Sequence, residues 1–349
     1  MLGDRDPRAP DRDSFPASVT LTALGMGRRL IAGITVLSLA LLLLVVAGVA
    51  LVAFGGNART GSVSAVLTIF TGTATIQRAG AAAVAAHSGD GLASGDSVLT
   101  GIESKAAVTY PDGSLTRLDS GTRITISVAR TAGGALKTSF AQSAGLTWNQ
   151  VKRLIGGSSF RVSGPNDAVA EVRGTRFGYY VEHDPSGRPV VWIDTYEGLV
   201  RVSGATGPAV SAGPGQRVTV KAGAAPTAPG AIPAADGQLS FTVFNQTVEA
   251  VGGTPVAFEN GTLSSGQTTR SYTVIADGRS DLQFVLGWPG STFQLAVVDP
   301  DGKVLAQPAS GSPPLMVVAA RARAGTWRFT VHDVQSGPQE AWWVVVGRK

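Results

Sequence analysis

Hydrophobic residues follow two different patterns along this chain. Residues 30–54 form one apolar run of 25 residues without a single charged side chain. A helix that crosses a bilayer needs about 20 apolar residues in succession, whereas a buried helix of a soluble core or a signal-peptide segment is usually shorter. The run therefore predicts one transmembrane helix over residues 30–54.

From residue 63 onward, short runs of alternating apolar and polar residues are separated by turn residues. Alternation of this kind is typical of strands that bury one face. Pro111-Asp112-Gly113-Ser114 is a strong turn signal, because Pro sets φ at the first central position and Gly relaxes the exit. We expect one β domain over 63–221, with strands at 63–70, 73–78, 106–110, 115–118, 122–128, 168–172, 176–182, 189–195, 199–203 and 217–221.

Other segments need a separate interpretation. Residues 136–162 have longer apolar spacing that fits either a helix or a buried strand, and residues 239–251 are equally open between the two. The Pro, Ala and Gly content of 222–237 indicates a linker, placed at 222–259. Six strand-like runs in residues 260–349 predict a small β-sandwich. The region outside the membrane is thus expected to be all-β.

Charge at the two flanks of the apolar run predicts its orientation. Arg28 and Arg29 adjoin its N-terminal end, and the other flank has a single arginine. By the positive-inside rule the N-terminus is cytoplasmic and the bulk of the chain extracytoplasmic, as a single-pass protein of the cell membrane. Residues 1–29 are rich in charge and Pro, which predicts a disordered tail. Cleavage of a signal peptide near Val63-Ser64-Ala65 is the alternative, and the length of the apolar run favours the anchor.

Composition removes several classes of function. The chain has no cysteine, which excludes disulfides, thiol catalysis and cysteine-ligated metals. Its net charge of +5 is spread along the chain, without a Lys/Arg-rich block, so no nucleic acid is expected as a partner. Nucleophile elbows, zinc-protease motifs and phosphate loops are absent. We therefore expect no enzyme activity, no cofactor and no metal.

Three short motifs suggest a ligand-binding site, and each also has a purely structural interpretation. Two arginines in Arg173-Gly174-Thr175-Arg176-Phe177 suit a carboxylate or phosphate, but a tight backbone path, a core Phe177 and carboxylate partners are favoured. Glu182-His183-Asp184 reads as a hairpin end rather than a metal site, since alternation turns the histidine away from the carboxylates. Asp299-Pro300-Asp301-Gly302 resembles half of a calcium loop, yet position 310 holds Ser where that loop needs Glu, which favours a β-turn.

Five landmarks follow one another along the chain: Gly95-Asp96-Ser97-Val98, Pro111-Asp112-Gly113-Ser114, Gly121-Thr122-Arg123, Arg173-Gly174-Thr175-Arg176-Phe177, and Glu197-Gly198-Leu199-Val200 with Ala212-Gly213-Pro214-Gly215-Gln216. Their order and spacing resemble a FecR-type domain over residues 66–221. The resemblance implies a solenoid-like, rolled, all-β extracytoplasmic domain of bacterial envelope proteins. Related proteins in iron-uptake signalling span the inner membrane and relay a signal to a sigma factor. The motif residues, with structural or binding roles, are Gly95, Asp96, Asp112, Gly113, Arg173, Gly174, Thr175, Arg176, Phe177, Glu197 and Gly198.

The C-terminal module is more loosely similar to the pre-peptidase C-terminal β-sandwich of secreted bacterial proteins. This similarity implies an accessory or binding module without chemistry of its own. The residues that carry it are Gly266-Gln267, Trp288, the Asp299–Gly302 turn and Ala324-Gly325-Thr326-Trp327.

These observations predict an envelope binding or scaffold protein that is held in the lipid bilayer by residues 30–54. Its FecR-type domain would engage an envelope protein or polysaccharide, with exposed strand edges as docking features. The alternative is a transmembrane regulator of a sigma factor, for which residues 1–29 are short and too rich in Pro and charge to fold as a helical anti-sigma segment. An enzyme acting on envelope polysaccharide is the weakest hypothesis.

Overall fold

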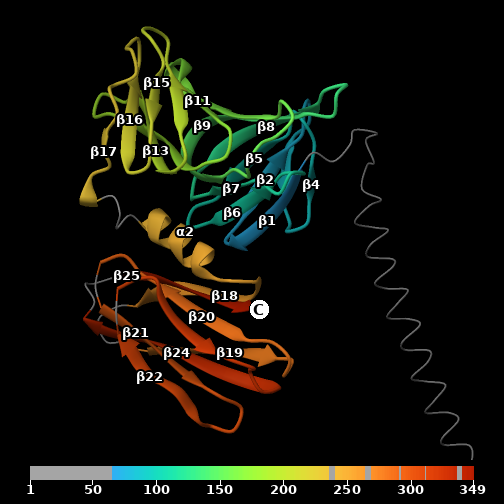
Figure 1. Ribbon diagram of the computed structural model, residues 1–349, viewed down its shortest axis with the longest axis vertical. Coiled ribbons are helices and arrows are strands. Elements are labelled where there is room, and N and C mark those ends of the chain that lie inside the picture. The colour runs from blue at the N-terminus through green and yellow to red at the C-terminus, as the bar shows by residue number, and fades with distance from the viewer. Residues whose placement is uncertain (1–64, 236–239, 264–268, 291, 311, 336–339) are drawn as a thin grey trace, which may run out of the picture. The chain divides into compact units, whose positions relative to one another are not determined.

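The computed structural model describes residues 65–235, 240–263, 269–290, 292–310, 312–335 and 340–349 (Figure 1). They all belong to one compact unit, Ser62–Lys349. The predicted anchor at 30–54 and its flanking Arg28 and Arg29 lie outside these ranges. Within them, no helix is both long and apolar enough to cross a membrane.

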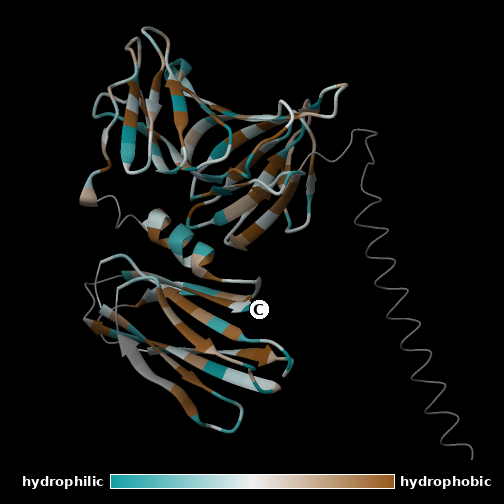
Figure 2. Cartoon of the chain, viewed as in Figure 1, coloured by the Kyte–Doolittle hydropathy of each residue, from teal (hydrophilic) through white to brown (hydrophobic). Residues whose placement is uncertain are grey.

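Strands dominate the described residues, which confirms the all-β prediction. Strand β8 (Arg123–Arg130) shows the cause, because Ile124 and Ile126 are buried while Thr125 and Ser127 are exposed. Figure 2 shows the same alternation as apolar and polar bands along many strands. Segment 136–162, whose sequence fits either a helix or a buried strand, contains two strands. Residues 239–251, which are open in the same way, contain a helix, α2 (Ser240–Ala250).

One hydrogen-bonded sheet of 17 strands makes up the β domain, which we define as residues 65–231. Its strands, besides β8, are β1 (Ala65–Thr71), β2 (Ala74–Gln77), β3 (Ala83–Ala85), β4 (Gly91–Leu92), β5 (Ser97–Thr100), β6 (Lys105–Thr109), β7 (Leu115–Leu118), β9 (Leu136–Gln150), β10 (Ser159–Ser163), β11 (Val169–Val172), β12 (Arg176–His183), β13 (Pro189–Glu197), β14 (Val200–Ser203), β15 (Val210–Ala212), β16 (Gln216–Lys221) and β17 (Gly230–Ala231). A 3₁₀ turn, η1 (Pro165–Asp167), joins β10 to β11.

The sheet folds over so that two layers face each other, and β9 belongs to both. The first half of β9 pairs with β8 and, in parallel, with β10. Its second half pairs with β7 and β12. The first layer contains β1, β4, β6, β7, β12, β13, β16 and β17, and the second contains β2, β3, β5, β8, β10, β11, β14 and β15.

A continuous apolar core fills the space between the two layers. Phe160, which is fully buried, meets the rings of Tyr110, Phe140 and Phe177 edge-on, at centroid distances of 5.5, 6.1 and 6.5 Å. Aromatic rings favour this edge-to-face geometry because the positive ring edge meets the negative ring face. Phe177, predicted from its motif to be a core residue, lies at the centre of the domain.

The C-terminal part forms a two-sheet module of two four-stranded antiparallel sheets. Trp288, Phe293 and Phe329 lie in the apolar core that the two sheets share. One sheet has the order β18-β25-β20-β23 and the other β19-β24-β21-β22. The strands are β18 (Thr254–Leu263), β19 (Thr269–Ala276), β20 (Leu282–Gly287), β21 (Thr292–Val298), β22 (Val304–Ser310), β23 (Leu315–Ala319), β24 (Gly325–Gln335) and β25 (Glu340–Arg348).

Candidate functional site

The outer face of the first layer carries large aromatic side chains outside the central core. Alternation sends every second residue of these strands to this face. The indole of Trp148 stacks on Tyr196 with centroids 4.3 Å apart, and the hydroxyls of Tyr180 and Tyr196 lie 3.2 Å apart. Together they form an aromatic surface made of Phe70, Trp148, Tyr180, Trp192 and Tyr196.

Helix α2 packs on this aromatic surface and also on the two-sheet module. Phe244 of α2 is fully buried and touches Phe70 of β1 at 5.7 Å. The same ring meets Phe258 of β18 at 5.9 Å and Trp343 of β25 at 6.1 Å. One shared apolar cluster, the junction cluster, thus joins the β domain, α2 and the two-sheet module. Its buried members are Trp148, Tyr180, Phe241, Val243, Phe244 and Trp343.

A buried charge group anchors the C-terminal end of α2 to the sheet. Glu249, whose side chain is 10% exposed, accepts hydrogen bonds from Arg117 Nη1 at 3.0 Å and Arg176 Nη1 at 2.7 Å. It also accepts one from Trp148 Nε1 at 2.7 Å. Ionised donors and acceptors make stronger hydrogen bonds than neutral ones. Three groups of the sheet therefore hold one carboxylate of the helix.

The two arginines of this group differ in their surroundings. Burial lowers the pKa of Arg117, although Glu249 opposes the shift. The hydrogen bond that Arg176 donates to Glu249 raises the pKa of this more exposed arginine. A guanidinium titrates so far above neutrality that both stay charged in spite of these shifts. The single charge of Glu249 consequently faces two fixed positive charges.

A second cation enters the junction cluster from β6. Lys105 Nζ lies 2.5 Å from Asp119 Oδ1 and 5.2 to 5.7 Å from the rings of Phe241, Phe244 and Trp343. Cations are attracted to the negative faces of aromatic rings, and more strongly when water is excluded. Lys105 therefore links the sheet to both α2 and β25.

Arg217 and Asp194 form a third buried pair beside the aromatic surface. Arg217 Nε and Nη2 each lie 2.6 Å from an oxygen of Asp194, and the guanidinium carbon lies 4.9 Å from the centre of the Trp192 ring. This bidentate geometry fixes the guanidinium plane against the indole. The groups of this site are thus bound to one another, and together they join the sheet, α2 and the two-sheet module.

The motif residues Asp96 and Asp112 make hydrogen bonds within the β domain, and Gly95 and Gly113 lie in turns between strands. Asp96 is 2% exposed and accepts hydrogen bonds from Arg78 Nη1 and from the backbone of Ala93, both at 2.9 Å. Asp112 accepts hydrogen bonds from the backbone and hydroxyl of Ser114 within its own turn. Gly95 and Gly113 both have positive φ, at 92° and 78°.

The Arg173–Phe177 motif divides between two environments. Arg176 binds Glu249 and, at 3.0 Å, Glu197 of β13. Arg173 is exposed and has no carboxylate partner in the part of the chain that the structure describes. A Cβ on Gly174 would lie 3.0 Å from Arg153 Cα, and one on Gly198 would lie 2.7 Å from the Gly174 carbonyl. The backbone of Thr175 pairs with that of Val151.

The other two motifs lie in hairpins. Asp184 accepts hydrogen bonds from the backbone of Ser186 and Arg188, which lowers its pKa. Asp299 accepts hydrogen bonds from the backbone of Asp301 and Lys303. Over the described ranges, no group of three or more His, Asp or Glu side chains is arranged to hold a metal ion.

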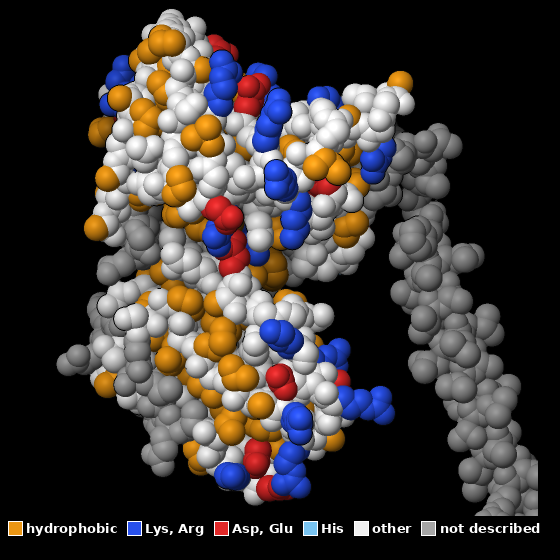
Figure 3. Space-filling view, viewed as in Figure 1, with side chains coloured by type: hydrophobic (Ala, Val, Ile, Leu, Met, Phe, Trp, Pro, Cys, Tyr) orange, Lys and Arg blue, Asp and Glu red, His pale blue; other side chains and the backbone are white. Residues whose placement is uncertain are grey.

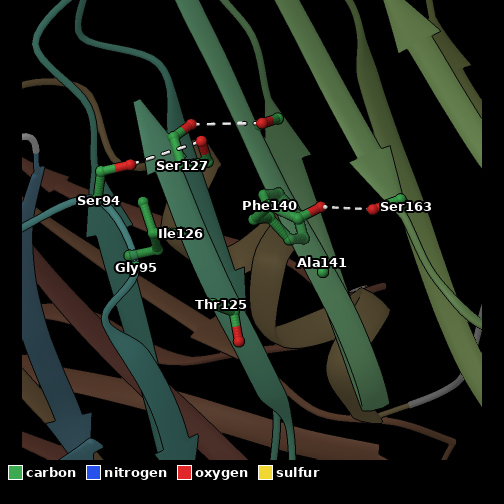
Figure 4. Close-up of a pocket in the computed structure, with 9 residues that line it drawn as sticks. Ser94, Gly95, Thr125, Ile126, Ser127, Phe140, Ala141 and Ser163 are labelled. Carbon is green, nitrogen blue, oxygen red and sulfur yellow. Dashed lines mark hydrogen bonds between the residues drawn. The ribbon is translucent and has the colours of Figure 1, made fainter. Parts of the chain in front are cut away.

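A shallow pocket lies on the outer face of the second layer, where hydroxyl side chains of neighbouring strands line up (Figure 4). Its volume is about 470 Å³. Ser94 and Ser127 lie at hydrogen-bond distance, and Ser139 and Ser163 bond to backbone carbonyls. No charged side chain lines the pocket, and its polar side chains are the hydroxyls of serines and a threonine.

Sequence reasoning missed Glu249, Lys105 and Arg117 as parts of a site. A signal was present in the helix segment SFTVFNQTVEA, where Glu249 is the one charged residue among apolar and neutral neighbours. A lone acid on a helix with two phenylalanines spaced three residues apart indicates a buried partner. The partners on β7 and β12 could not be found, because they are 132 and 73 residues away.

Comparison with known proteins identifies one family. Residues 96–201, from β5 to β14, match the FecR protein family, which confirms the FecR resemblance over that range. No curated protein matches the chain. Resemblance of residues 260–349 to the pre-peptidase C-terminal β-sandwich stays a prediction.

Two solved structures give the extent of structural similarity. A proposed anti-sigma factor from Parabacteroides distasonis is 18% identical with a TM-score of 0.35, and the match covers 43% of this chain and 64% of that protein. PliG of Aeromonas hydrophila, a periplasmic inhibitor of g-type lysozyme, is also 18% identical. Its TM-score is 0.23, and the match covers 28% of this chain and 89% of PliG.

Proposed function

We propose that this chain is a transmembrane signalling regulator whose FecR-type domain receives a signal outside the cytoplasm. The observation that carries the proposal is the FecR family match at residues 96–201. In this proposal residues 30–54 span the membrane, with Arg28 and Arg29 on the cytoplasmic side. No catalytic step is part of the function.

The junction cluster supports the proposal, because it gives a route by which binding at one module reaches the other. Helix α2 is held by Glu249 to the sheet and by Phe244 to both modules. A ligand that favours one arrangement of these contacts shifts the population of the whole outer region. The two-sheet module would serve as the accessory or binding part, as its predicted family implies.

A deletion in the producing organism tests the relay. A strain that lacks the gene would be complemented with the full chain or with a chain that lacks residues 1–27, which keeps Arg28 and Arg29. We expect the deletion to abolish the transcriptional response that the full chain restores, since it removes the cytoplasmic segment. Transcript profiles measured by RNA sequencing provide the comparison.

A C-terminal reporter that is active only outside the cytoplasm controls for membrane insertion of both chains. If both chains insert equally and give identical transcript profiles, the relay is wrong. The second candidate, an envelope binding or scaffold protein, then takes its place. It is favoured by strands such as β3 and β23, each of which pairs with one neighbour among the described strands and so leaves an edge for a partner strand.

A further inference from the structure

The first strand of the β domain, β1, starts at one end of the first layer, and we call this end the tether end. The row of register partners at this end of the first layer leads from β1 through β6, β7, β9 and β12 to β13. It consists of Val66, Thr109, Leu115, Gln150, Arg176 and Glu197. Strand β1 starts at Ala65, one residue before this row, and neighbouring strands are about 4.8 Å apart.

The segment 151–158 extends beyond this row and covers the tether end. The backbone amide of Lys152 donates to Ser114 Oγ at 3.0 Å, in the turn between β6 and β7. The amide of Leu154 donates to the carbonyl of Arg173 at 3.1 Å. The hydroxyl of Ser158 accepts from the Leu136 amide, next to the turn at the tip of the β8–β9 hairpin. The hairpin tip, the 151–158 segment and Arg173 therefore lie together.

Positive charge is concentrated at this end. The carboxylates beside the row of register partners already accept hydrogen bonds: Asp112 from Ser114, Glu197 and Glu249 from Arg176, and Asp90 from the His87 amide. In Figure 3, Lys and Arg side chains gather on the visible face of the β domain, with fewer Asp and Glu side chains among them. The exposed cations of the tether end, none with a carboxylate partner in the described parts of the chain, are Arg130, Lys137, Lys152, Arg153 and Arg173.

Large apolar side chains project from the same end. Ile155 is 78% exposed and lies two residues after Arg153 in the chain. Leu199 is 59% exposed and follows Gly198, which lies against Gly174. Basic residues around protruding apolar side chains are typical of surfaces that lie on anionic membranes, where the cations bind lipid headgroups and the apolar side chains enter the interface.

The length of the tether decides which partner can reach this end. Residues 55–64, ten in all, separate the predicted transmembrane segment from Ala65. A fully extended chain of that length reaches at most about 35 Å, which bounds the distance between β1 and the end of the predicted transmembrane segment. The cations lie at the same end of the domain as β1, to which the anchor is tethered. Anionic lipid headgroups are therefore present at high local concentration near them.

We propose that the tether end docks on anionic lipid headgroups of the membrane that holds the anchor, through Lys152, Arg153 and Arg173 with Ile155 inserted at the interface. This inference rests on the proposed membrane anchor. Docking fixes the β domain in one orientation relative to the bilayer.

The test uses the full chain reconstituted into vesicles, with an environment-sensitive fluorophore on one cysteine. Because the chain has no cysteine, Ile155→Cys and Ile275→Cys each give a single labelled site. Ile275, on β19 of the two-sheet module, is also 78% exposed and so serves as the matched control. Quenching by lipids that carry a nitroxide reports contact with the bilayer.

We expect strong quenching at position 155 in vesicles of phosphatidylglycerol and phosphatidylcholine, and several-fold weaker quenching at 275. Each basic residue near an anionic surface contributes about 1 kcal/mol, so Lys152→Gln, Arg153→Gln and Arg173→Gln together should lower the ratio of docked to undocked protein roughly a hundredfold. Raised salt should weaken docking in the same direction. Arg279→Gln, Lys303→Gln and Arg328→Gln remove equal charge from exposed positions of the two-sheet module and should leave quenching unchanged.

Equal quenching at 155 and 275, quenching that persists in phosphatidylcholine alone, or quenching that survives the first triple variant would each overturn the proposal. Extraction of the vesicles with alkaline carbonate separates this failure from failure of the anchor. A chain that resists extraction but shows no quenching at 155 refutes only the docking, whereas a chain that is extracted refutes the anchor itself.

Discussion

At the scale of single residues, Glu249 is a buried carboxylate whose hydrogen-bond donors all come from the sheet. One carboxylate receives hydrogen bonds from Arg117, Arg176 and Trp148. The Arg117 side chain is only 6% exposed, so water cannot replace a lost partner. An unpaired buried charge costs several kcal/mol, while an exposed ion pair contributes little.

We expect Glu249→Gln to lower the free energy of unfolding by about 2–4 kcal/mol, because it leaves Arg117 charged and buried without a counter-ion. Urea denaturation followed by tryptophan fluorescence measures this change. Glu197→Gln is the matched control, since Glu197 also binds Arg176 but is 69% exposed. That variant should cost less than about 1 kcal/mol. Equal losses in the two variants would show that Glu249 does not anchor the helix.

At the scale of elements, two turn glycines with similar backbone conformations differ in their surroundings. Gly187 and Gly198 have φ of 74° and 78°, in the left-handed region. A Cβ on Gly187 would meet nothing within 4 Å. A Cβ on Gly198 would lie 2.7 Å from the Gly174 carbonyl oxygen and from Thr175 Cγ2. The turn after β13 is therefore pressed against the start of β12.

Gly187→Ala should cost about 1–2 kcal/mol from backbone strain alone. Gly198→Ala should cost that amount and about 1–3 kcal/mol more, because the backbone at Gly174 must move. Thermal unfolding of both variants measures the difference as a larger fall in Tm for Gly198→Ala. Indistinguishable Tm values would mean that the two turns are equally open.

Elements with strict alternation could be predicted from the sequence, and those with mixed burial could not. The alternation in β8 reflects one buried and one exposed face. The second half of β9 carries buried residues on both faces, because Thr147 faces the core while Trp148 faces α2. Its pattern was therefore open between helix and strand. The junction cluster was unpredictable for a related reason, since its members come from strands far apart in the chain.

At the scale of the whole molecule, the five tyrosines share one property. The pKa of Tyr110, Tyr179, Tyr180 and Tyr196 is raised mainly by burial, and Tyr272 shows the same direction with the same main cause. In the unfolded chain a tyrosine loses its proton near pH 10. Between that pH and the raised native pKa values, the native state holds more protons than the unfolded state.

Stability should therefore be unaffected by these groups below about pH 10 and should fall as the pH rises above it. We expect the absorbance of tyrosinate to appear together with the loss of circular dichroism, as one alkaline unfolding transition. In urea the same titration should have its midpoint near pH 10, which supplies the control. Absorbance that rises near pH 10 while the circular dichroism stays native would contradict the burial of the tyrosines.

The strand that belongs to both layers has a consequence for how the protein is made. Because synthesis proceeds from the N-terminus, β7 and β8 exist before their shared partner β9, with backbone groups on one edge of each still unpaired. Open strand edges can pair with other chains and aggregate. A nascent chain that ends before residue 136 therefore cannot complete either layer, and until β9 emerges these two edges are open to other chains.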